Sequence, residues 1–191
     1  MKVLIAYASK YGATREIAER LADRIRAAGL EAQAQPMTTV SDLSAYDAVV
    51  IGSAAYIGHW QKEATEFVQS NSAVLAGRPT WLFSSGPLGN EPTNAPGLDQ
   101  RGAAEPKEIA ELRATISPRD HRVFFGALDP AKLGFRDRAI RILPAGRALL
   151  PEGDFRDWQD VNAWADSIAG DLAALATGGR TAHQTDMEAS S

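Results

Sequence analysis

The sequence predicts a doubly wound α/β domain: a five-stranded parallel sheet, in the order 2-1-3-4-5, with helices on both faces. Strand-length apolar runs alternate along the chain with segments whose apolar residues recur at helical spacing. Most of these runs are uninterrupted, which is typical of strands buried on both faces. Strands that alternate with helices favour parallel pairing and right-handed crossovers. The chain has 191 residues, 45% of them hydrophobic, which is enough for one domain with a sizeable core.

The first unit is a strand, a loop and a helix. The expected bounds are a strand at 3–7, a loop at 8–12 and a helix pattern at 17–28. Gly29 supplies the C-terminal stop of this helix. Residues 30–35 alternate only weakly, so they predict a short second strand near an edge of the sheet.

The rest of the chain repeats the alternation. Further strands are predicted at 48–51, 80–83 and 123–127, and further helices at 60–70, 106–116 and 157–176. Pro106 is expected near the start of its helix, and glycines at 178–179 are expected to end the last one. We therefore expect a single domain over 1–178, with a long surface loop at 88–106, a basic insertion at 130–153 and a disordered tail at 179–191.

The loop after the first strand has the composition of an anion site. Ser9 and Thr14 supply hydroxyl donors, and Gly12 allows a left-handed turn. The first turn of the following helix leaves backbone N–H groups without partners at the positive end of its dipole. Because a donor to a charged group contributes about 1.5–3 kcal/mol, several donors together favour a terminal phosphate monoester. The spacing matches neither GxxxxGK[ST] nor GxGxxG, and an ordinary polar turn is the alternative.

Residues 9–14, Ser-Lys-Tyr-Gly-Ala-Thr, resemble the phosphate loop of the flavodoxin family, which holds the 5′-phosphate of FMN. The resemblance implies a flavodoxin-like fold. That family usually has a hydroxyl residue where Tyr11 stands, so one side-chain donor is expected to be lost here. A phosphoacceptor receiver, another doubly wound module, is rejected. It needs acidic residues after the first and third strands, where Ala8, Ser9 and Ser53 stand.

Two further loops are expected beside the phosphate loop, because the switch point lies beyond the carboxyl ends of strands 1, 3 and 4. Residues 53–60 offer Tyr56 and Trp60 as faces for a planar ring, and Gly58 as a backbone free to turn a carbonyl or an N–H toward it. Residues 84–89 offer backbone N–H groups for the pyrimidine oxygens of a flavin. No side-chain acid or base is predicted, because a flavin carries the chemistry.

The chain also resembles the menaquinone-dependent protoporphyrinogen IX dehydrogenase family, a group with the flavodoxin fold. The matching segments are 14–18, 56–59, 126–129, 158–161 and 164–165. The resemblance implies FMN contacts at Ser9, Gly12, Ala13, Thr14, Tyr56, Ile57, Gly58, Ser85, Gly86, Pro87, Leu88 and Gly89. Lys10, Tyr11 and Ala55 complete the candidate cofactor site. Residues 132–150 match nothing position by position, so FMN binding transfers better than the porphyrin substrate.

Three functions follow from these patterns. The first is an FMN-dependent oxidoreductase, with a tetrapyrrole as the reduced substrate and a quinone or another acceptor. The second is a one-electron carrier without its own substrate site, although a net charge of −4 is mild for such carriers. The third is a flavodoxin-like protein that has lost the flavin and binds partners.

Composition excludes other classes. With no cysteine, and with three histidines far apart in sequence, the chain offers no disulfide, redox thiol or metal-ligand spacing. The net charge of −4 gives no argument for nucleic acid. The start of the chain lacks a signal-peptide pattern, and no apolar run reaches the roughly 18 residues of a membrane span, so a cytoplasmic location is expected.

A basic segment reverses the acidic balance locally. It spans 132–150 and holds Lys132, Arg136, Arg138, Arg141 and Arg147, opposed by Asp137 and interleaved with apolar residues. This composition favours an anionic partner, either the inner membrane surface, where quinone resides, or the carboxylates of a porphyrin. The alternative is a solvated helix whose apolar side packs on the sheet or on a second subunit of a homo-oligomer.

Overall fold

The computed structural model describes residues 1–86, 88 and 105–188. Five parallel strands are hydrogen-bonded in the order β2-β1-β3-β5-β6, so the predicted doubly wound sheet is confirmed. These strands are β1 (Lys2–Ala8), β2 (Glu31–Pro36), β3 (Ala48–Tyr56), β5 (Thr80–Ser85) and β6 (Asp120–Phe124). A short strand, β4 (His59–Trp60), pairs antiparallel with the end of β3. As predicted, β2 lies at an edge.

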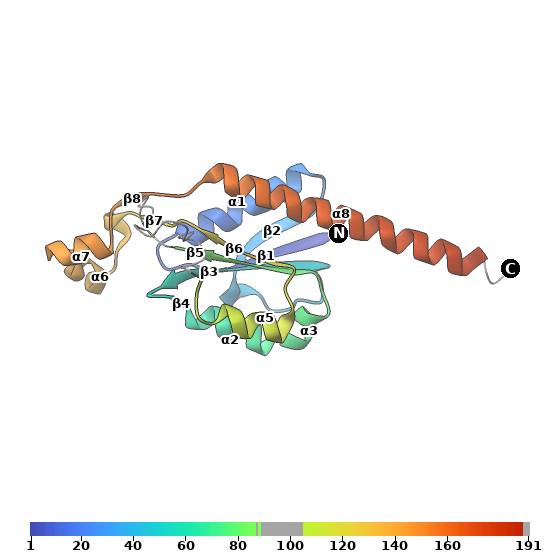
Figure 1. Cartoon of the computed structure of the whole chain (residues 1–191), viewed down its shortest axis with the longest axis horizontal. Helices are drawn as coiled ribbons and strands as arrows, with labels where there is room; N and C mark the ends of the chain where they lie inside the picture. Colours follow the sequence, from blue (N-terminus) through green and yellow to red (C-terminus); the bar gives the residue numbers. More distant parts are fainter. Residues whose placement is uncertain (87, 89–104, 189–191) are drawn as a thin grey trace, which may run out of the picture.

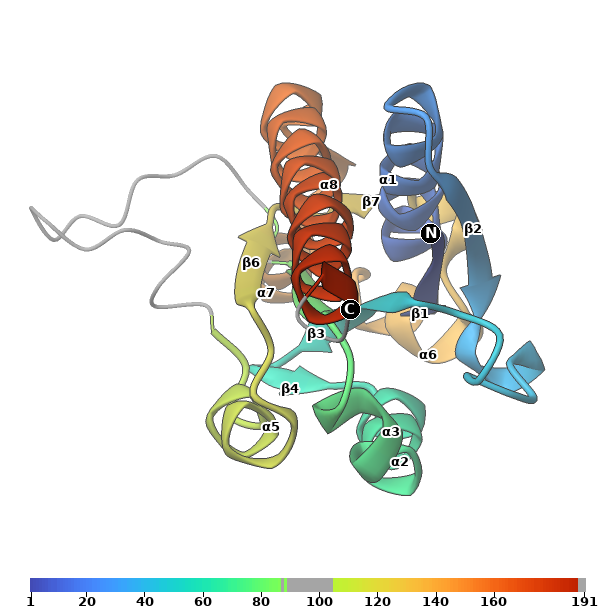
Figure 2. The ribbon, with the colours of Figure 1, turned by 90° about the vertical axis from the view of Figure 1, so that its right-hand side faces the viewer.

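Helices cover both faces of the sheet. α1 and α8 lie on one face, and α2, α3 and α5 lie on the other (Figures 1 and 2). Their bounds are α1 (Ala13–Ala27), α2 (Lys62–Ser70), α3 (Ser72–Ala76), α5 (Ile109–Ile116) and α8 (Trp158–Glu188). The short helix α3 and the 3-10 turn η1 (Met37–Thr39) form in segments where the sequence predicts connections.

The periodicity of apolar side chains produces this layering. Leu4 and Ile5 of β1 are completely buried because neighbouring residues of a strand point to opposite faces, and both faces are covered. On the face of α1, Ile17 and Leu21 pack in one cluster with Trp164 of α8. The carboxyl ends of the central strands are therefore held in fixed positions, and the loops that follow them start from a rigid frame.

The segment after β6 lies beyond the carboxyl ends of the strands (Figure 1). It contains a ribbon of β7 (Ala127–Leu128) and β8 (Gly153–Asp154), the turn η2 (Pro130–Lys132) and the helices α6 (Phe135–Ile140) and α7 (Pro144–Leu149). Gly134 precedes α6 and Pro144 opens α7, and these residues divide the segment. The single solvated helix that one alternative expected is therefore not formed.

Strand pairing sets two boundaries that the sequence pattern misplaces. α2 begins at Lys62, two residues later than predicted, because residues 59–60 pair with the end of β3. β6 ends at Phe124 rather than at residue 127, because the Phe124 carbonyl accepts the Gly86 N–H at 2.9 Å and the residues that follow pair with β8. The first correction comes from a local hairpin, and the second comes from contacts distant in sequence.

α5 also begins later than predicted. It starts at Ile109 rather than at Pro106, because a backbone group of the residues before it bonds to another loop. The Lys107 N–H donates to the carbonyl of Gly58 at 3.0 Å, which ties this segment to the end of the β3–β4 hairpin.

α8 continues to Glu188, through the glycines at 178–179 where the sequence predicts its end and a disordered tail. A glycine costs a helix about 1 kcal/mol relative to alanine but keeps its backbone N–H, so it does not have to end the helix. The last residues of the predicted tail, 189–191, lie outside the described residues. Among the described residues no helix, α8 included, combines the length and the apolar character that crossing a bilayer requires.

Candidate functional site

A cavity of about 570 Å³ lies at the carboxyl ends of β1, β3 and β5, where the sequence predicts three loops to meet. The predicted site residues that line it are Ser9, Lys10, Tyr11, Ala13, Thr14, Ala55, Tyr56, Ile57, Gly58, Ser85, Gly86 and Leu88. Gly12 lines a neighbouring pocket on the outer side of its loop. Pro87 and Gly89 lie outside the described residues. The structure thus brings the three predicted loops to one cavity.

The loop at 9–14 is shaped by Gly12. Its φ of +97° lies in the left-handed region, which glycine adopts without strain. The Gly12 N–H donates to Ser9 Oγ at 3.1 Å, and the Gly12 carbonyl accepts the Glu16 N–H at 3.0 Å, the first helical bond of α1. The chain turns sharply here, so Ala13 and Thr14 in the first turn of α1 form part of the cavity wall.

Thr14 supplies the feature of this loop that points to a ligand. The residue is only 1% exposed, it lines the cavity, and its hydroxyl has no hydrogen-bond partner among the described residues. A buried hydroxyl without a partner costs about 1–3 kcal/mol, so native proteins rarely retain one without a reason. A bound anion at the N-terminus of α1 would accept this hydrogen bond.

The side chains of Lys10 and Tyr11 turn to α6 instead of the loop. The Tyr11 hydroxyl donates to Asp137 Oδ2, and Lys10 Nζ lies 2.8 Å from the same oxygen. These two hydrogen bonds lower the pKa of Asp137, and the bond with Asp137 raises the pKa of Lys10. As the sequence predicts, Tyr11 is lost as a loop donor. Its hydroxyl and the Lys10 ammonium hold α6 beside the cavity.

The second loop is a tight hairpin. Pairing of Tyr56 with His59 leaves only Ile57 and Gly58 as the turn, and both have positive φ, 51° and 73°. This is the pattern of a type I′ turn, in which a β-branched residue such as Ile is strained. Ile57 is 98% exposed, so the strain is not offset by packing among the described residues. Backbone strain of this kind clusters at functional sites.

Tyr56 and Trp60 lie in different environments. Tyr56 lines the cavity, and its ring makes an edge contact with Tyr11 at 6.4 Å between centroids. Burial raises the pKa of the Tyr56 phenol, so this side chain is neutral at pH 7, and Lys10 Nζ lies 5.0 Å from its ring centroid. Trp60 is 4% exposed, and its indole Nε1 donates to Ser84 Oγ at 2.7 Å. The expectation that Trp60 offers a face to a planar ring is therefore wrong, because the side chain belongs to the core.

Two backbone groups expected to face the ligand have partners in the protein. The carbonyl of Gly58 accepts the Lys107 N–H, and the N–H of Gly86 donates to the Phe124 carbonyl. Gly86 has a φ of +123°, and a Cβ there would come within 3.2 Å of the Ala55 carbonyl oxygen. Glycine is required at this position for close approach of β3 and the loop after β5.

The family model described as "Flavodoxin domain" matches residues 4–142, well over half of the chain. The chain belongs to the flavodoxin domain family. Protoporphyrinogen IX dehydrogenase [quinone] of Escherichia coli (strain K12) is 31% identical over 176 residues, which cover 88% of this chain and 95% of that protein.

Solved flavodoxins share the fold at low sequence identity. A flavodoxin from the domain Archaea has a TM-score of 0.57 at 16% identity, over 91% of this chain and 99% of that chain. Oxidised Flavodoxin 2 from Bacillus cereus has a TM-score of 0.55 at 21% identity, over 90% of this chain and 99% of that chain. These likenesses support the flavodoxin fold.

This flavodoxin domain has cavity residues that sequence reasoning did not select. They are Ala54, Gly126, Ala127, Leu128, Asp137, Ile140 and Leu150. Residues 126–128 follow the last strand of the sheet, so the rule that parallel strands end at one edge could have found them. Asp137 and Ile140 come from a short helix in an irregular segment, and no periodic signal leads to them.

A buried polar chain fixes the hairpin of this flavodoxin domain to the sheet. Ser84 Oγ, which accepts from Trp60, lies 2.8 Å from His121 Nε2, and His121 Nδ1 lies 2.9 Å from Glu105 Oε1. Since a carboxylate can only accept, Nδ1 carries the proton and Nε2 accepts from the serine. Ser, His and Glu in this order also occur in hydrolase triads. Ser84 is completely buried here, so this series of hydrogen bonds has a structural role.

We expect His121 to make stability fall in acid. Burial lowers the pKa of this imidazole, and the hydrogen bond to Glu105 offsets only part of the effect. The unfolded chain takes up a proton below a pH of about 6.5, whereas the folded state resists it. Unfolding free energy should therefore fall as pH drops below about 6.5, by at most about 1.4 kcal/mol per pH unit for this group. Urea unfolding of wild type and His121→Gln from pH 7.5 to 5 measures it, and parallel curves would contradict the assignment.

Proposed function

We propose that this chain binds FMN in the cavity at the carboxyl ends of β1, β3 and β5 and acts as an oxidoreductase. The observation that carries the proposal is the buried Thr14 hydroxyl, which has no partner among the described residues and lines the cavity at the start of α1. A phosphate monoester there would accept from this hydroxyl and from the free N–H groups of the first helical turn. Membership of the flavodoxin domain family supports a flavin as the group that carries this phosphate.

The remaining walls fit the rest of such a ligand. The cavity volume of about 570 Å³ lies in the range of small-molecule sites, about 300–1,000 Å³. Tyr56 presents a neutral aromatic side chain to the cavity, and ring contacts of this type contribute about 0.5–1.5 kcal/mol beyond area burial. A bound flavin supplies hydride and electron transfer, so the protein has to bind, orient and exclude water.

The apolar residues of the cavity favour a small-molecule substrate over a protein redox partner. Leu88, Ile140 and Leu150 line it, and the last two come from the segment that follows β6. A carrier that exchanges electrons through an exposed cofactor edge has no use for this cover. The 31% identical E. coli relative is named for protoporphyrinogen IX and quinone, and we propose a tetrapyrrole donor and a quinone acceptor here.

The decisive experiment has two stages. The purified protein is first titrated with FMN and with riboflavin, and tighter binding of FMN is the expected result. The FMN-loaded protein is then mixed without oxygen with protoporphyrinogen IX and a menaquinone analogue, and porphyrin formation is followed by its fluorescence. FMN binding without porphyrin formation would point to the one-electron carrier, and failure to bind FMN would point to a protein that binds partners without a flavin.

We further propose that 132–150 contacts an anionic membrane. Three large apolar side chains project there: Phe135 is 89% exposed, Ile142 71% and Leu143 65%. Arg138 and Arg147 are exposed beside them, and basic residues near anionic lipid contribute about 1 kcal/mol each. Arg141 is less available than the sequence predicts, because its side chain is only 16% exposed and lies 3.5 Å from Glu152. This surface is adjacent to Ile140, which lines the cavity.

Sedimentation with anionic vesicles measures this contact. Wild type should co-sediment at low salt and less at high salt, because salt screens the basic residues. The triple change Phe135→Ser, Ile142→Ser and Leu143→Ser should abolish co-sedimentation. Val74→Ser is the matched control, since Val74 is 39% exposed on α3, on another part of the surface. A wild-type protein that stays in the supernatant and runs as a dimer would assign the apolar surface to a homo-oligomer instead.

A further inference from the structure

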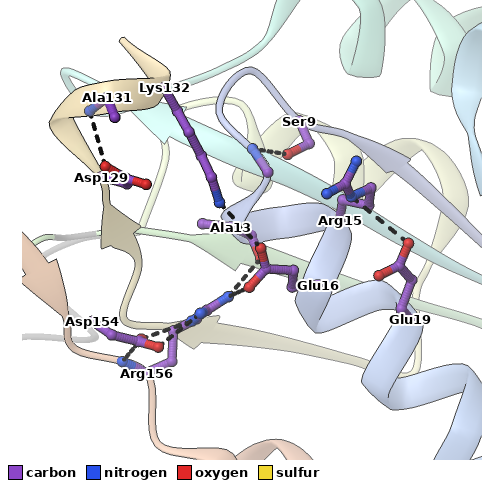
Figure 3. A network of polar contacts seen from close by, with 11 residues as sticks. Ser9, Ala13, Arg15, Glu16, Glu19, Asp129, Ala131, Lys132, Asp154 and Arg156 are labelled. Atoms are coloured by element: carbon purple, nitrogen blue, oxygen red, sulfur yellow. Dashed lines mark hydrogen bonds and ion pairs between the residues drawn. The ribbon is translucent and has the colours of Figure 1, made fainter.

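Arg156 connects the start of α1 to the ribbon behind it (Figure 3). Its side chain is only 7% exposed, although it carries a full charge. Nη1 donates to Glu16 Oε2 at 2.7 Å and to the Ala13 carbonyl at 3.5 Å. Nε and Nη2 donate to the two carboxylate oxygens of Asp154 at 2.8 and 2.7 Å. The guanidinium also lies 4.4 Å from the ring centroid of Trp158, at the start of α8.

The contacts join two walls of the cavity. Ala13, in the first turn of α1, lines the cavity, and Asp154 is in β8, paired with Ala127 of β7, which also lines the cavity. A bidentate arginine–carboxylate pair has a defined geometry, so Arg156 fixes the position of the first turn of α1 relative to this ribbon. Residues 140 positions apart in the sequence, Glu16 and Arg156, are thereby held together.

Glu16 places a negative charge near the proposed phosphate site, and Arg156 compensates this charge. The residue is in the first turn of α1, and its carboxylate lies beside the loop, where a Cβ at Gly12 would come within 3.8 Å of Oε1. Burial acts to raise the pKa of Glu16, but the hydrogen bond and charge of Arg156, together with the charges of Lys132 and Arg15, outweigh it and lower this pKa. The ionised carboxylate is compensated by Arg156 and by Lys132, which lies 3.6 Å away. With Asp154, the four side chains are balanced in charge.

We propose that Arg156 is a positioning residue for the phosphate loop, which orients the first turn of α1 and cancels the charge of Glu16 so that the loop accepts a dianion. This inference rests on the proposed binding of FMN. Arg156 does not line the 570 Å³ cavity, although it lines a neighbouring pocket of about 280 Å³ with Glu16 and Ala13, so we assign its effect to its contacts with these two residues. An uncompensated unit charge beside the phosphate loop changes affinity for a phosphate on the order of tenfold at low salt.

The test compares two ligands that differ in the phosphate. Ligand-free variants are titrated with FMN and with riboflavin at low and high salt, by quenching of flavin fluorescence. Arg156→Gln should bind FMN about tenfold more weakly than wild type, less so at high salt, with riboflavin affinity within about threefold. The double variant Glu16→Gln/Arg156→Gln removes one charge of each sign and should recover FMN affinity to within about threefold of wild type. Arg156→Lys keeps the charge, and its FMN affinity should lie between those of wild type and Arg156→Gln.

Arg24→Gln is the matched control. Arg24 forms a bidentate pair with Asp166 at 2.7 and 2.9 Å, also between α1 and the C-terminal part of the chain, but at the far end of α1 from the loop. It should leave both affinities unchanged. Equal weakening of FMN and riboflavin in Arg156→Gln, or a double variant as weak as the single one, would overturn the proposal. If Arg156→Gln does not fold, the double variant and Arg156→Lys decide in the same way.

Failure of the underlying function has a different signature. A wild-type protein that binds riboflavin as tightly as FMN would overturn the phosphate assignment and this inference together. A wild-type protein that prefers FMN, with Arg156→Gln unchanged in both affinities and salt dependence, would overturn the role of Arg156 alone.

Discussion

Replacing Thr14 with valine should weaken FMN binding by about 1–3 kcal/mol, a factor of about 5 to 150, without destabilising the ligand-free protein. Valine has nearly the shape of threonine, so packing around this buried position is kept while the hydroxyl is lost. The hydroxyl has no partner among the described residues, and a buried donor in that state costs free energy. Unfolding free energy of the ligand-free variant should therefore equal or exceed that of wild type.

Two measurements on the same variant test this prediction. Calorimetry gives FMN affinity, and urea unfolding of the ligand-free protein gives stability. Thr14→Ser keeps the hydroxyl and should bind FMN within about threefold of wild type. Riboflavin affinity should not change in either variant, because the lost donor serves the phosphate. Unchanged FMN affinity in Thr14→Val would show that the loop does not hold the phosphate.

Gly52→Ala should destabilise the fold by about 1–3 kcal/mol or more, because a Cβ at this position would overlap the ring of Phe83. Gly52 is in the central strand β3, and Phe83 is its direct partner in β5. The phenylalanine is completely buried and packs against the rings of Phe124 and Trp164, with centroids 6.0 and 6.2 Å away. Because this ring is packed against two other rings in the core, relief of the overlap requires the ring or the strands to shift.

A second glycine gives the matched control. Gly170 is in α8, and a Cβ there meets nothing within 4 Å. Gly170→Ala should therefore stabilise the protein by about 0.5–1 kcal/mol, since alanine loses less backbone entropy in a helix. The same chemical change is thus expected to have opposite signs at the two positions. Urea unfolding measures both, and equal effects would contradict the packing seen around Phe83.

The three site loops were predictable because their causes are local or topological. The apolar run of β1 and the stripe of α1 are visible within a few residues, and Gly29 marks the helix end with a φ of +87°. Five strands that alternate with helices favour right-handed parallel units and suit the doubly wound order 2-1-3-4-5. These rules place residues 9–14, 53–60 and 84–89 at one sheet edge.

The partners of individual groups in those loops were not predictable. Trp60 has the composition of a stacking residue, but its indole finds Ser84 in the core. The Gly58 carbonyl and the Gly86 N–H meet backbone groups of Lys107 and Phe124. A hydrogen bond needs its two groups within about 3 Å, and sequence periodicity gives element positions only to within a few residues.

By itself, the sequence determined the alternation of strands and helices and the edge at which the cavity lies, because apolar periodicity acts over short distances and parallel strands end at one edge. The tertiary structure alone decided which side chains pair with one another at that edge. Asp137 meets Lys10 from 127 residues away, and Arg156 meets Glu16 from 140. Such ion pairs leave no periodic trace, since any charged residue on an irregular segment has the same local pattern. Their geometry is set only when the core has packed and brought the segments together.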